Sequence, residues 1–233
     1  MQILTIIQAR MGSKRFPGKV LRELAGQALM GHLLDAVLKI SLKTEVVVAS
    51  SCKSENSALE YYCNTSGIVI ERGDEENVAL RFLNILKKYK PDFFIRLNAD
   101  SPLLDWRIIE KGRNILLRNG DADIISTVFE MTAPPGMNVE ILRADTFMRE
   151  YNLFSRPEHF EHVTKYFYEH AYRFRKYSLD TGFKNEGSYT FTVDTPEDFK
   201  RMEKIFSFME KPHMEYSLEE KCAMYQQVIT ENA

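Results

Sequence analysis

The stretch ILTIIQARMGSKRFPGK, residues 3–19, combines two patterns that decide the fold. Ile3 to Ile7 is a short apolar run, as in strands that are buried on both faces of a sheet. A polar loop with four cations and two glycines follows from Arg10 to Lys19. Ligands of open α/β sheets bind beyond the carboxyl ends of the strands. This loop therefore stands where a ligand is expected.

Apolar runs and amphipathic stretches alternate through the first half of the chain. Further buried strands are predicted at 46–49, 68–70, 93–97 and 124–128, and helices at 29–38, 54–66, 78–90 and 105–118, with Ser54 and Asp105 as caps. Alternation at this spacing is typical of right-handed βαβ units. It predicts an α/β fold of three layers, α/β/α, with a mainly parallel mixed sheet.

The pattern changes between Met131 and Thr181, where a Pro-Pro-Gly turn precedes a short apolar run and a helix rich in His and Tyr at 157–170. We interpret 131–181 as an inserted arm, a lid or a dimer contact. The chain then returns with a predicted strand at 189–193. Helix starts follow at Thr195 and Ser217, each with acidic residues in the first turn. One domain accounts for residues 1–233.

Composition excludes several classes of protein. The formal net charge of −2 argues against a partner that is a nucleic-acid polymer or an anionic membrane. No run of 18 apolar residues occurs, so no transmembrane helix is expected, and the N-terminus looks like a strand, not a signal peptide. Three cysteines without a CxxC pair favour a reducing cytoplasm.

The first loop carries the groups that bind a polyphosphate. Glycines let backbone N–H groups approach phosphate closely, Arg contacts phosphate oxygens in pairs, and Lys adds a point charge. The loop is not a Walker A motif, because five residues separate Gly12 from Gly18 and Val20 follows Lys19. The alternative is a solvated basic loop.

Acidic residues follow two other predicted strands. Asp100 comes after the strand at 93–97, and Asp194 after the strand at 189–193. Two carboxylates at neighbouring strand ends can hold Mg²⁺, which prefers oxygen ligands and also takes phosphates. For Asp194 a role in satisfying the N–H groups of the next helix remains an equal alternative. His159 and His162 could share a metal, but a polar helix face explains them better.

Five segments together resemble the sugar-acid cytidylyltransferases, the family of acylneuraminate and 3-deoxy-manno-octulosonate cytidylyltransferases. They are residues 7–21, 96–105, 135–140, 161–164 and 192–198. The similarity is greatest to the spore coat polysaccharide biosynthesis branch. It covers nearly the whole chain in the same order, and VDTPED at 193–198 is among its most specific motifs.

The resemblance implies a nucleotide-binding fold, CTP and a small sugar as substrates, Mg²⁺ as cofactor and a homodimer. It implies roles in nucleotide binding for Ala9, Arg10, Gly12, Ser13, Arg15, Lys19 and Asn98. It also implies that Asp100 and Asp194 hold the metal, and that Asn138, Glu140 and His162 contact the sugar. The resemblance further implies a catalytic set of Arg10, Arg15, Lys19, Asp100 and Asp194. Phe16 replaces the usual Leu, and Thr192 stands where some sialic acid enzymes have another acid.

The implied reaction is attack of a sugar hydroxyl on the α-phosphorus of CTP, with release of pyrophosphate. The sugar is expected to be a 2-keto sugar acid used in surface polysaccharide biosynthesis. Two alternatives stay open: a glycosyltransferase that uses a ready-made nucleotide sugar, and a nucleotide-binding regulator without catalysis. The sequence shows no general base.

Overall fold

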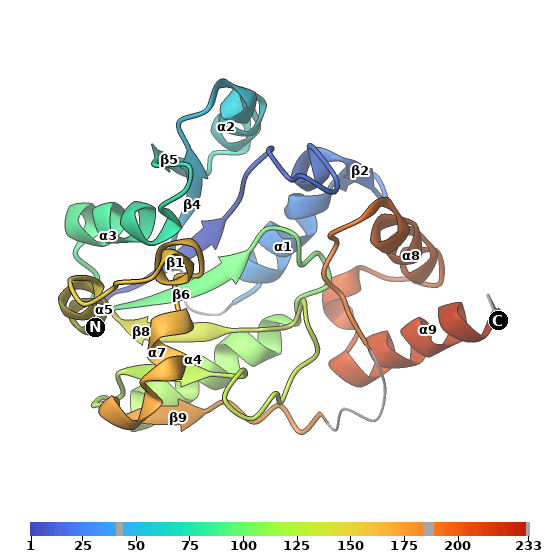
Figure 1. Cartoon of the computed structure of the whole chain (residues 1–233). Helices are drawn as coiled ribbons and strands as arrows, with labels where there is room; N and C mark the ends of the chain where they lie inside the picture. The colour runs from blue at the N-terminus through green and yellow to red at the C-terminus, as the bar shows by residue number, and fades with distance from the viewer. Residues whose placement is uncertain (41–43, 184–188, 232–233) are drawn as a thin grey trace.

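The apolar run that begins at Ile3 forms strand β1 inside the main sheet of the computed structural model (Figure 1). The structure describes residues 1–40, 44–183 and 189–231. Among these residues the main sheet has seven strands, in the order β5-β4-β1-β6-β8-β7-β9. Their bounds are β1 Ile3–Gln8, β4 Glu45–Ser51, β5 Val69–Gly73, β6 Phe93–Asn98, β7 Ile124–Ser126, β8 Glu140–Arg143 and β9 Lys176–Ser178. Strands β2 (Glu23–Leu24) and β3 (Gln27–Ala28) form a separate hairpin.

Strands β5, β4, β1 and β6 are parallel to one another. Strand β8 lies antiparallel between β6 and β7, and β9 is parallel to β7. The predicted mainly parallel mixed sheet is therefore confirmed. The strand predicted at 124–128 ends at Ser126, because the Ser126 hydroxyl accepts the N–H of Val128 at 2.9 Å and turns the chain.

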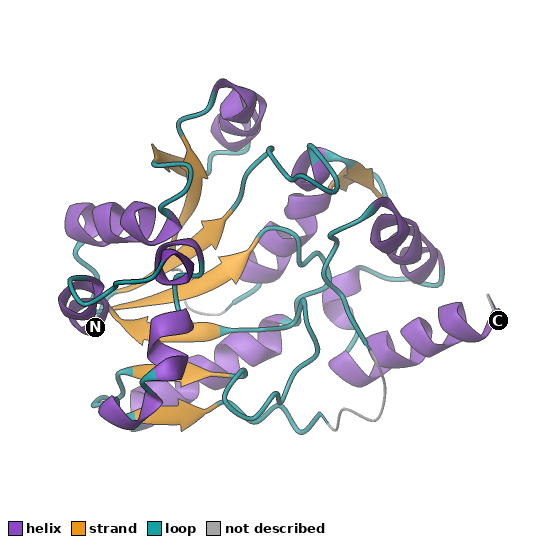
Figure 2. Ribbon diagram, viewed as in Figure 1, coloured by secondary structure: helices purple, strands orange, loops and turns teal. Residues whose placement is uncertain are grey.

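Helices cover both faces of the sheet (Figure 2). One apolar cluster joins the sheet to α1, α2, α4, α8 and α9, and a second joins it to α3, α5 and α7. The α-helices are α1 Leu29–Leu38, α2 Ser57–Thr65, α3 Val78–Tyr89, α4 Trp106–Arg118, α5 Ala144–Tyr151, α6 Pro157–Glu161, α7 Lys165–Glu169, α8 Pro196–Ser207 and α9 Leu218–Glu231. Short 3₁₀ helices are η1 Lys19–Leu21, η2 Ser54–Asn56, η3 Ala171–Arg173 and η4 His213–Glu215. The three predicted layers are present.

The starts of α4, α8 and α9 follow from the residues at their caps. Asp105 accepts the N–H of Arg107 at 2.9 Å, and Thr195 forms a capping box with Asp198. Ser217 and Glu220 bond each other's backbone in the same way at the start of α9. The prediction of Ser54 as a cap is wrong, because residues 54–56 form the 3₁₀ turn η2 and α2 begins one turn later.

Two predicted elements in the second half differ from the structure. The helix predicted at 157–170 is broken into α6 and α7, because Val163 between them turns inward and is fully buried in the second apolar cluster. The strand predicted at 189–193 is an extended segment outside the sheet. The N–H of Phe191 bonds the Pro135 carbonyl at 2.7 Å, and Val193 bonds Asp100 at 2.9 Å, so both partners lie in loops.

The segment 131–181, predicted as an inserted arm, has two parts. Strands β8 and β9 belong to the main sheet, and α5 packs against α3, so this part is integral to the fold. Helices α6 and α7 lie where the strands end and carry residues that line the site described below. Within the described ranges, no helix has the length and apolarity needed to span a bilayer.

Lys221 of α9 is a buried cation beneath the loop that carries Asp100. Its side chain is fully buried, and its ammonium donates to the Leu103 carbonyl at 3.1 Å. Burial, offset in part by Asp105, lowers the pKa of Lys221 to about 8 from 10.5. Below pH 8 the amine is charged in both the folded and the unfolded chain, and its burial lowers stability there. Stability recovers as pH rises from 8 towards 10.5, because only the unfolded chain then keeps the proton.

We therefore expect Lys221→Met to raise the free energy of unfolding at pH 7. The gain should be about 2 kcal/mol: ~3 from the relieved burial of charge, less ~1 for the lost hydrogen bond. This gain in the free energy of unfolding should disappear above pH 10. Urea unfolding at pH 7 and pH 10 measures both values, with the exposed Lys200→Met as control. Equal effects of Lys221→Met at the two pH values would contradict the lowered pKa of Lys221.

Candidate active site

The site lies where β1 and β6 end side by side. Their register pairs Gln8 with Asn98, so the chain leaves the sheet at Ala9 and Ala99 in adjacent positions. The path along the chain runs from β1 to β4 and β5 on one side and returns to β6 on the other. A crevice opens where the direction of winding reverses, and this is the usual ligand site of such sheets.

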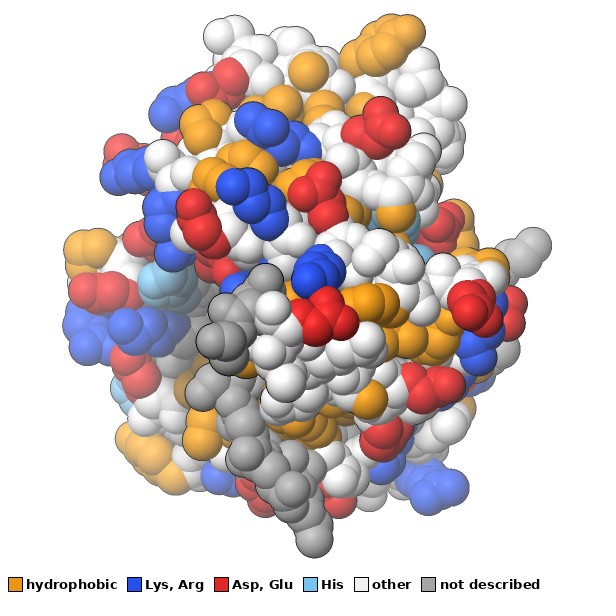
Figure 3. Space-filling model, turned by 90° about the vertical axis from the view of Figure 1, so that its right-hand side faces the viewer, with side chains coloured by type: hydrophobic (Ala, Val, Ile, Leu, Met, Phe, Trp, Pro, Cys, Tyr) orange, Lys and Arg blue, Asp and Glu red, His pale blue; other side chains and the backbone are white. Residues whose placement is uncertain are grey.

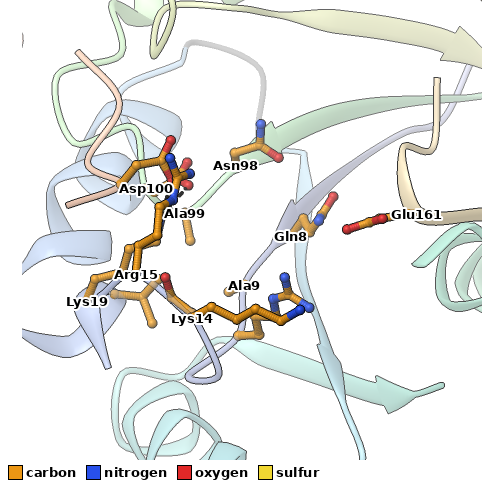
Figure 4. A pocket seen from close by; sticks show the side chains of 13 residues that line it. Gln8, Ala9, Lys14, Arg15, Lys19, Asn98, Ala99, Asp100 and Glu161 are labelled. Atoms are coloured by element: carbon orange, nitrogen blue, oxygen red, sulfur yellow. Dashed lines mark hydrogen bonds and ion pairs between the residues drawn. The ribbon is translucent and has the colours of Figure 1, made fainter. Parts of the chain in front are cut away.

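A polar cavity of about 320 Å³ occupies this crevice (Figure 4). It is lined by Gln8, Ala9, Arg10, Ser13, Lys14, Arg15, Lys19, Val20, Asn98, Ala99, Asp100, Glu161 and Asp194. The structure thus gathers every predicted nucleotide-binding and catalytic residue except Gly12. In Figure 4 the long side chain of Lys14 reaches across the cavity, and Gln8 and Glu161 lie opposite the group formed by Arg15 and Asp100.

Backbone hydrogen bonds close the first loop, and an aromatic contact packs it against α8. The carbonyl of Met11 accepts the N–H groups of Ser13 and Gly18, both at 2.9 Å. Gly18 has φ of 72°, which a glycine adopts without strain. Phe16 is buried and packs edge-on against Phe199 with ring centroids 5.6 Å apart. Phe16, the aromatic residue in place of the usual Leu, therefore holds the loop against α8.

Gly12 lies behind the cavity, against the 3₁₀ helix η2. A Cβ there would come within 2.1 Å of a Glu55 carboxylate oxygen, so a larger residue would require the exposed Glu55 side chain to move. Beside it the N–H of Met11 donates to Asn56 Oδ1 at 2.8 Å, and Asn56 Nδ2 donates to Ser51 Oγ at 2.7 Å. Asn56 is fully buried and ties the loop to the end of β4. No sequence motif indicated this role for Asn56.

Replacing Asn56 by alanine should loosen the first loop. The change leaves the Met11 N–H and the Ser51 hydroxyl without partners, which costs about 1–3 kcal/mol of stability. We also expect the KM for CTP to rise more than kcat falls, because the loop must then be ordered by the nucleotide. Thermal unfolding and steady-state kinetics measure the two effects. A destabilised variant with unchanged KM would show that Asn56 supports the fold but not the loop.

Lys19 joins the two predicted acids. Its ammonium donates to Asp100 Oδ2 at 2.8 Å, to Asp194 Oδ1 at 3.0 Å and to the Val193 carbonyl at 2.7 Å. Arg15 also contacts Asp194 Oδ1 at 3.0 Å. The bond from the Val193 N–H to the Asp100 carbonyl sets the two acidic segments side by side. Residues far apart in sequence thus meet around one cation.

The donor set fits Mg²⁺. Oxygens from Asp100 and Asp194 both lie within 3.0 Å of a single positively charged atom, so the pair can share a cation. Both side chains remain partly exposed and line the cavity. Carboxylate oxygens are the ligands that Mg²⁺ prefers, and one or two of them with substrate phosphates make a typical site.

A second polar cavity of about 290 Å³ adjoins the first, and Asn98 lines both. The predicted sugar contacts Asn138, Glu140 and His162 all line it, together with Arg96, Val128, Thr164, Lys165 and Tyr168. Glu140 is almost fully buried, and its two oxygens accept from Arg96 and Tyr168. Burial and this carboxylate raise the pKa of Tyr168 well above its usual value. Tyr168 therefore stays a donor, and Glu140 orients the wall of the cavity.

Several lining residues were outside the predicted set. Lys14 and Glu161 belong to segments whose charge or motif was noted, and Arg96 begins the motif that contains Asp100. Gln8 belongs to the motif at 7–21 but was not assigned a role, whereas Lys165 and Tyr168 reach the site only through the packing of distant elements. His159 is not available to a metal shared with His162, since its ring nitrogens face Ser155 and Glu169 at 3.3 and 3.0 Å.

The surface at this end of the sheet is mixed in charge. Figure 3 looks onto it, and on the visible face Lys and Arg side chains lie among Asp and Glu side chains. A nucleic-acid polymer is usually held by an extended basic surface. The pattern here suits a small polyphosphate better, because cations and carboxylates converge in one cavity.

A cytidylyltransferase profile matches residues 4–230, almost the whole chain. The chain belongs to the cytidylyltransferase family. The chain is 30% identical over 210 residues to the spore coat polysaccharide biosynthesis protein SpsF of Bacillus subtilis, covering 88% of this chain and 86% of that protein. It is 34% identical over 202 residues to the uncharacterized protein MJ1063 of Methanocaldococcus jannaschii, covering 86% and 81%.

The solved structure of a cytidylyltransferase from Leptospira borgpetersenii has the same fold. It superposes with a TM-score of 0.88 at 26% identity, covering 100% of this chain and 95% of that one. Membership of the family makes this chain a nucleotidyltransferase that uses CTP. The crevice between β1 and β6 is accordingly the candidate site of this cytidylyltransferase.

Proposed function

We propose that this cytidylyltransferase transfers CMP from CTP to a hydroxyl of a 2-keto sugar acid, with Mg²⁺ and with release of pyrophosphate, in surface polysaccharide biosynthesis. The observation that carries the proposal is the pair of adjoining polar cavities that share Asn98. One has the cations and acids for a metal-bound triphosphate, and the other has donors for a sugar. The similarity to SpsF supports the pathway.

The first cavity binds the triphosphate through the backbone and cations of the first loop. Arg10 and Arg15 keep 41% and 65% of their side chains exposed, so they can turn onto phosphate oxygens. Arg10 makes a long, 3.5 Å contact to Glu75. Lys19 exchanges its carboxylate partners for phosphate oxygens when the nucleotide binds. These cations stabilise the pyrophosphate as it leaves.

Asp100 and Asp194 would hold the metal beside these phosphates. When bound, Mg²⁺ offsets phosphate charge and lowers the pKa of the attacking hydroxyl, so the chain needs no separate general base. The residues of the chain supply position. Asn98, at the boundary of the two cavities, sets the distance between the hydroxyl and the α-phosphorus, and such alignment accounts for much of the rate.

The second cavity suits an acidic sugar. Lys165 places positive charge on its wall, whereas the charge of Arg96 is balanced by Glu140, and His162 adds a further donor or acceptor. Asn138 offers an amide to sugar hydroxyls, while Thr127 holds its oxygen from behind at 3.2 Å. A neutral sugar would leave the charge of Lys165 without a partner from the substrate, which disfavours its binding.

A matrix of nucleotides against sugars, scored by pyrophosphate release, tests the proposal. We expect turnover with CTP and an eight- or nine-carbon 2-keto sugar acid, and at least about a hundredfold less with the matching neutral sugar, as a site built for a polar group rejects analogues without it. Release of a nucleoside di- or monophosphate from a nucleotide sugar would indicate a glycosyltransferase instead. Thermal stabilisation by CTP without turnover on any sugar would indicate a regulator.

We also propose a homodimer in the cytoplasm. Met131, Leu153 and Tyr172 in segment 131–181 are large apolar side chains that are at least half exposed, and a second copy would cover them. The three cysteines are free thiols, which suits a reducing compartment. Light scattering measures the mass, and Tyr172→Glu should shift it towards the monomer. A monomeric wild type at assay concentrations would overturn the dimer.

A further inference from the structure

A second group of metal-binding side chains lies away from the two cavities. His32 and Asp35 are on α1, and His213 is in η4, the turn that joins α8 to α9. One potential ligand atom from each residue lies within 4.8 Å of the other two. Among the described residues, no other group of three or more His, Cys, Asp or Glu side chains comes this close together. Both histidines are buried, and Asp35 is partly exposed.

His32 presents one lone pair to the centre of this group. Its Nε2 lies 2.7 Å from the Leu24 carbonyl, which can only accept, so Nε2 carries the proton and Nδ1 does not. The amide nitrogen of Gln27 donates to Nδ1 at 2.9 Å and to Asp35 Oδ2 at 2.7 Å. A carbonyl behind the outer N–H is the usual support of a metal-binding imidazole. The Gln27 amide thus stands where a cation would stand.

His213 is the unexplained member of the group. It is only 5% exposed, and neither ring nitrogen has a hydrogen-bond partner within the described part of the chain. Its ring meets that of His32 edge-on, with centroids 5.2 Å apart. A buried imidazole without a hydrogen-bond partner calls for a missing ligand.

We propose that His32 Nδ1, the Asp35 carboxylate and one ring nitrogen of His213 bind a divalent transition-metal ion of the zinc type. Two imidazoles and one carboxylate are a common set for Zn²⁺, with a fourth position left for water. The Gln27 amide leaves when the ion enters, and Asp35 marks the side open to solvent. The ion ties the α8–α9 turn to α1, so its role is structural and is separate from the Mg²⁺ proposed for Asp100 and Asp194.

Metal titration of the chelator-treated full chain with ZnCl₂, followed by calorimetry, tests this site. We expect one tight ion per chain and a melting temperature that rises with zinc concentration. Co²⁺ should give the visible absorption of an imidazole-bound ion. His213→Ala and Asp35→Asn should each weaken binding at least about 10- to 100-fold, the loss seen even for outer-shell partners. Gln27→Ala should bind more tightly, because no amide competes.

Two controls separate this site from other metal binding. His170→Ala removes a histidine elsewhere and should leave zinc binding unchanged, as should Asp100→Asn in the proposed catalytic site. Asp35→Asn changes a partly exposed residue and keeps the test valid if His213→Ala fails to fold. Absence of stoichiometric binding to the wild type, equal binding by Asp35→Asn, or loss of binding in Asp100→Asn would each overturn the proposal.

Discussion

Replacing Asp100 by asparagine is expected to lower kcat by about 10²- to 10⁴-fold, which corresponds to ~3–5 kcal/mol of transition-state stabilisation. The amide keeps the shape of the side chain but has no charge to offer a metal ion. Asp100 is partly exposed, and its carboxylate bonds Lys19, which keeps Asp194 and the Val193 carbonyl as partners. The fold should therefore survive, and the loss should be confined to catalysis.

Pyrophosphate release under saturating substrates measures this effect, with circular dichroism and thermal unfolding as checks on the fold. Asp145→Asn, an exposed acid at the start of α5, is the matched control and should leave kcat unchanged. A rate within a factor of about three of the wild type, less than ~1 kcal/mol, would remove Asp100 from the catalytic set.

Replacing Lys19 by methionine should affect both stability and catalysis. Only 9% of the lysine side chain is exposed, and its ammonium is the cation shared by Asp100 and Asp194. Without it Asp100 loses this ion-pair partner, and Asp194 keeps the exposed Arg15. Loss of one partner from a fully buried pair costs about 3–5 kcal/mol, and we expect about 1–3 here because the acids are partly solvated. The loss of a phosphate contact should also lower kcat/KM for CTP by about 10²- to 10³-fold.

Adding Mg²⁺ distinguishes the effect of Lys19→Met on stability from its effect on catalysis. The vacated space between the carboxylates should accept Mg²⁺, so the ion should raise the melting temperature of the variant more than that of the wild type. Catalysis should not recover with it. Lys111→Met, an exposed change on α4, is the control. Equal magnesium effects on variant and wild type would argue against a metal held by Asp100 and Asp194.

Much of the framework was predictable because it depends on local patterns. Apolar runs such as Ile3 to Ile7 became sheet strands, since a strand covered on both faces needs no polar residue. Caps such as Thr195 act within one turn of helix, so the start of α8 was placed correctly. The misassigned segment 189–193 alternates like a strand because Phe191 and Val193 are buried, but its backbone partners are loops.

The sequence by itself determined the layered α/β fold, the family resemblance and the chemistry of the first loop and the two acidic segments, because each of these depends on residues close together in the chain. Only the tertiary structure decided that Lys19 joins Asp100 to Asp194, that Asn56 anchors the loop and that Tyr168 and Glu140 form one wall. It also decided that His213 meets His32. These contacts join segments distant in sequence, and their distances depend on the packing of whole elements, which local periodicity does not encode.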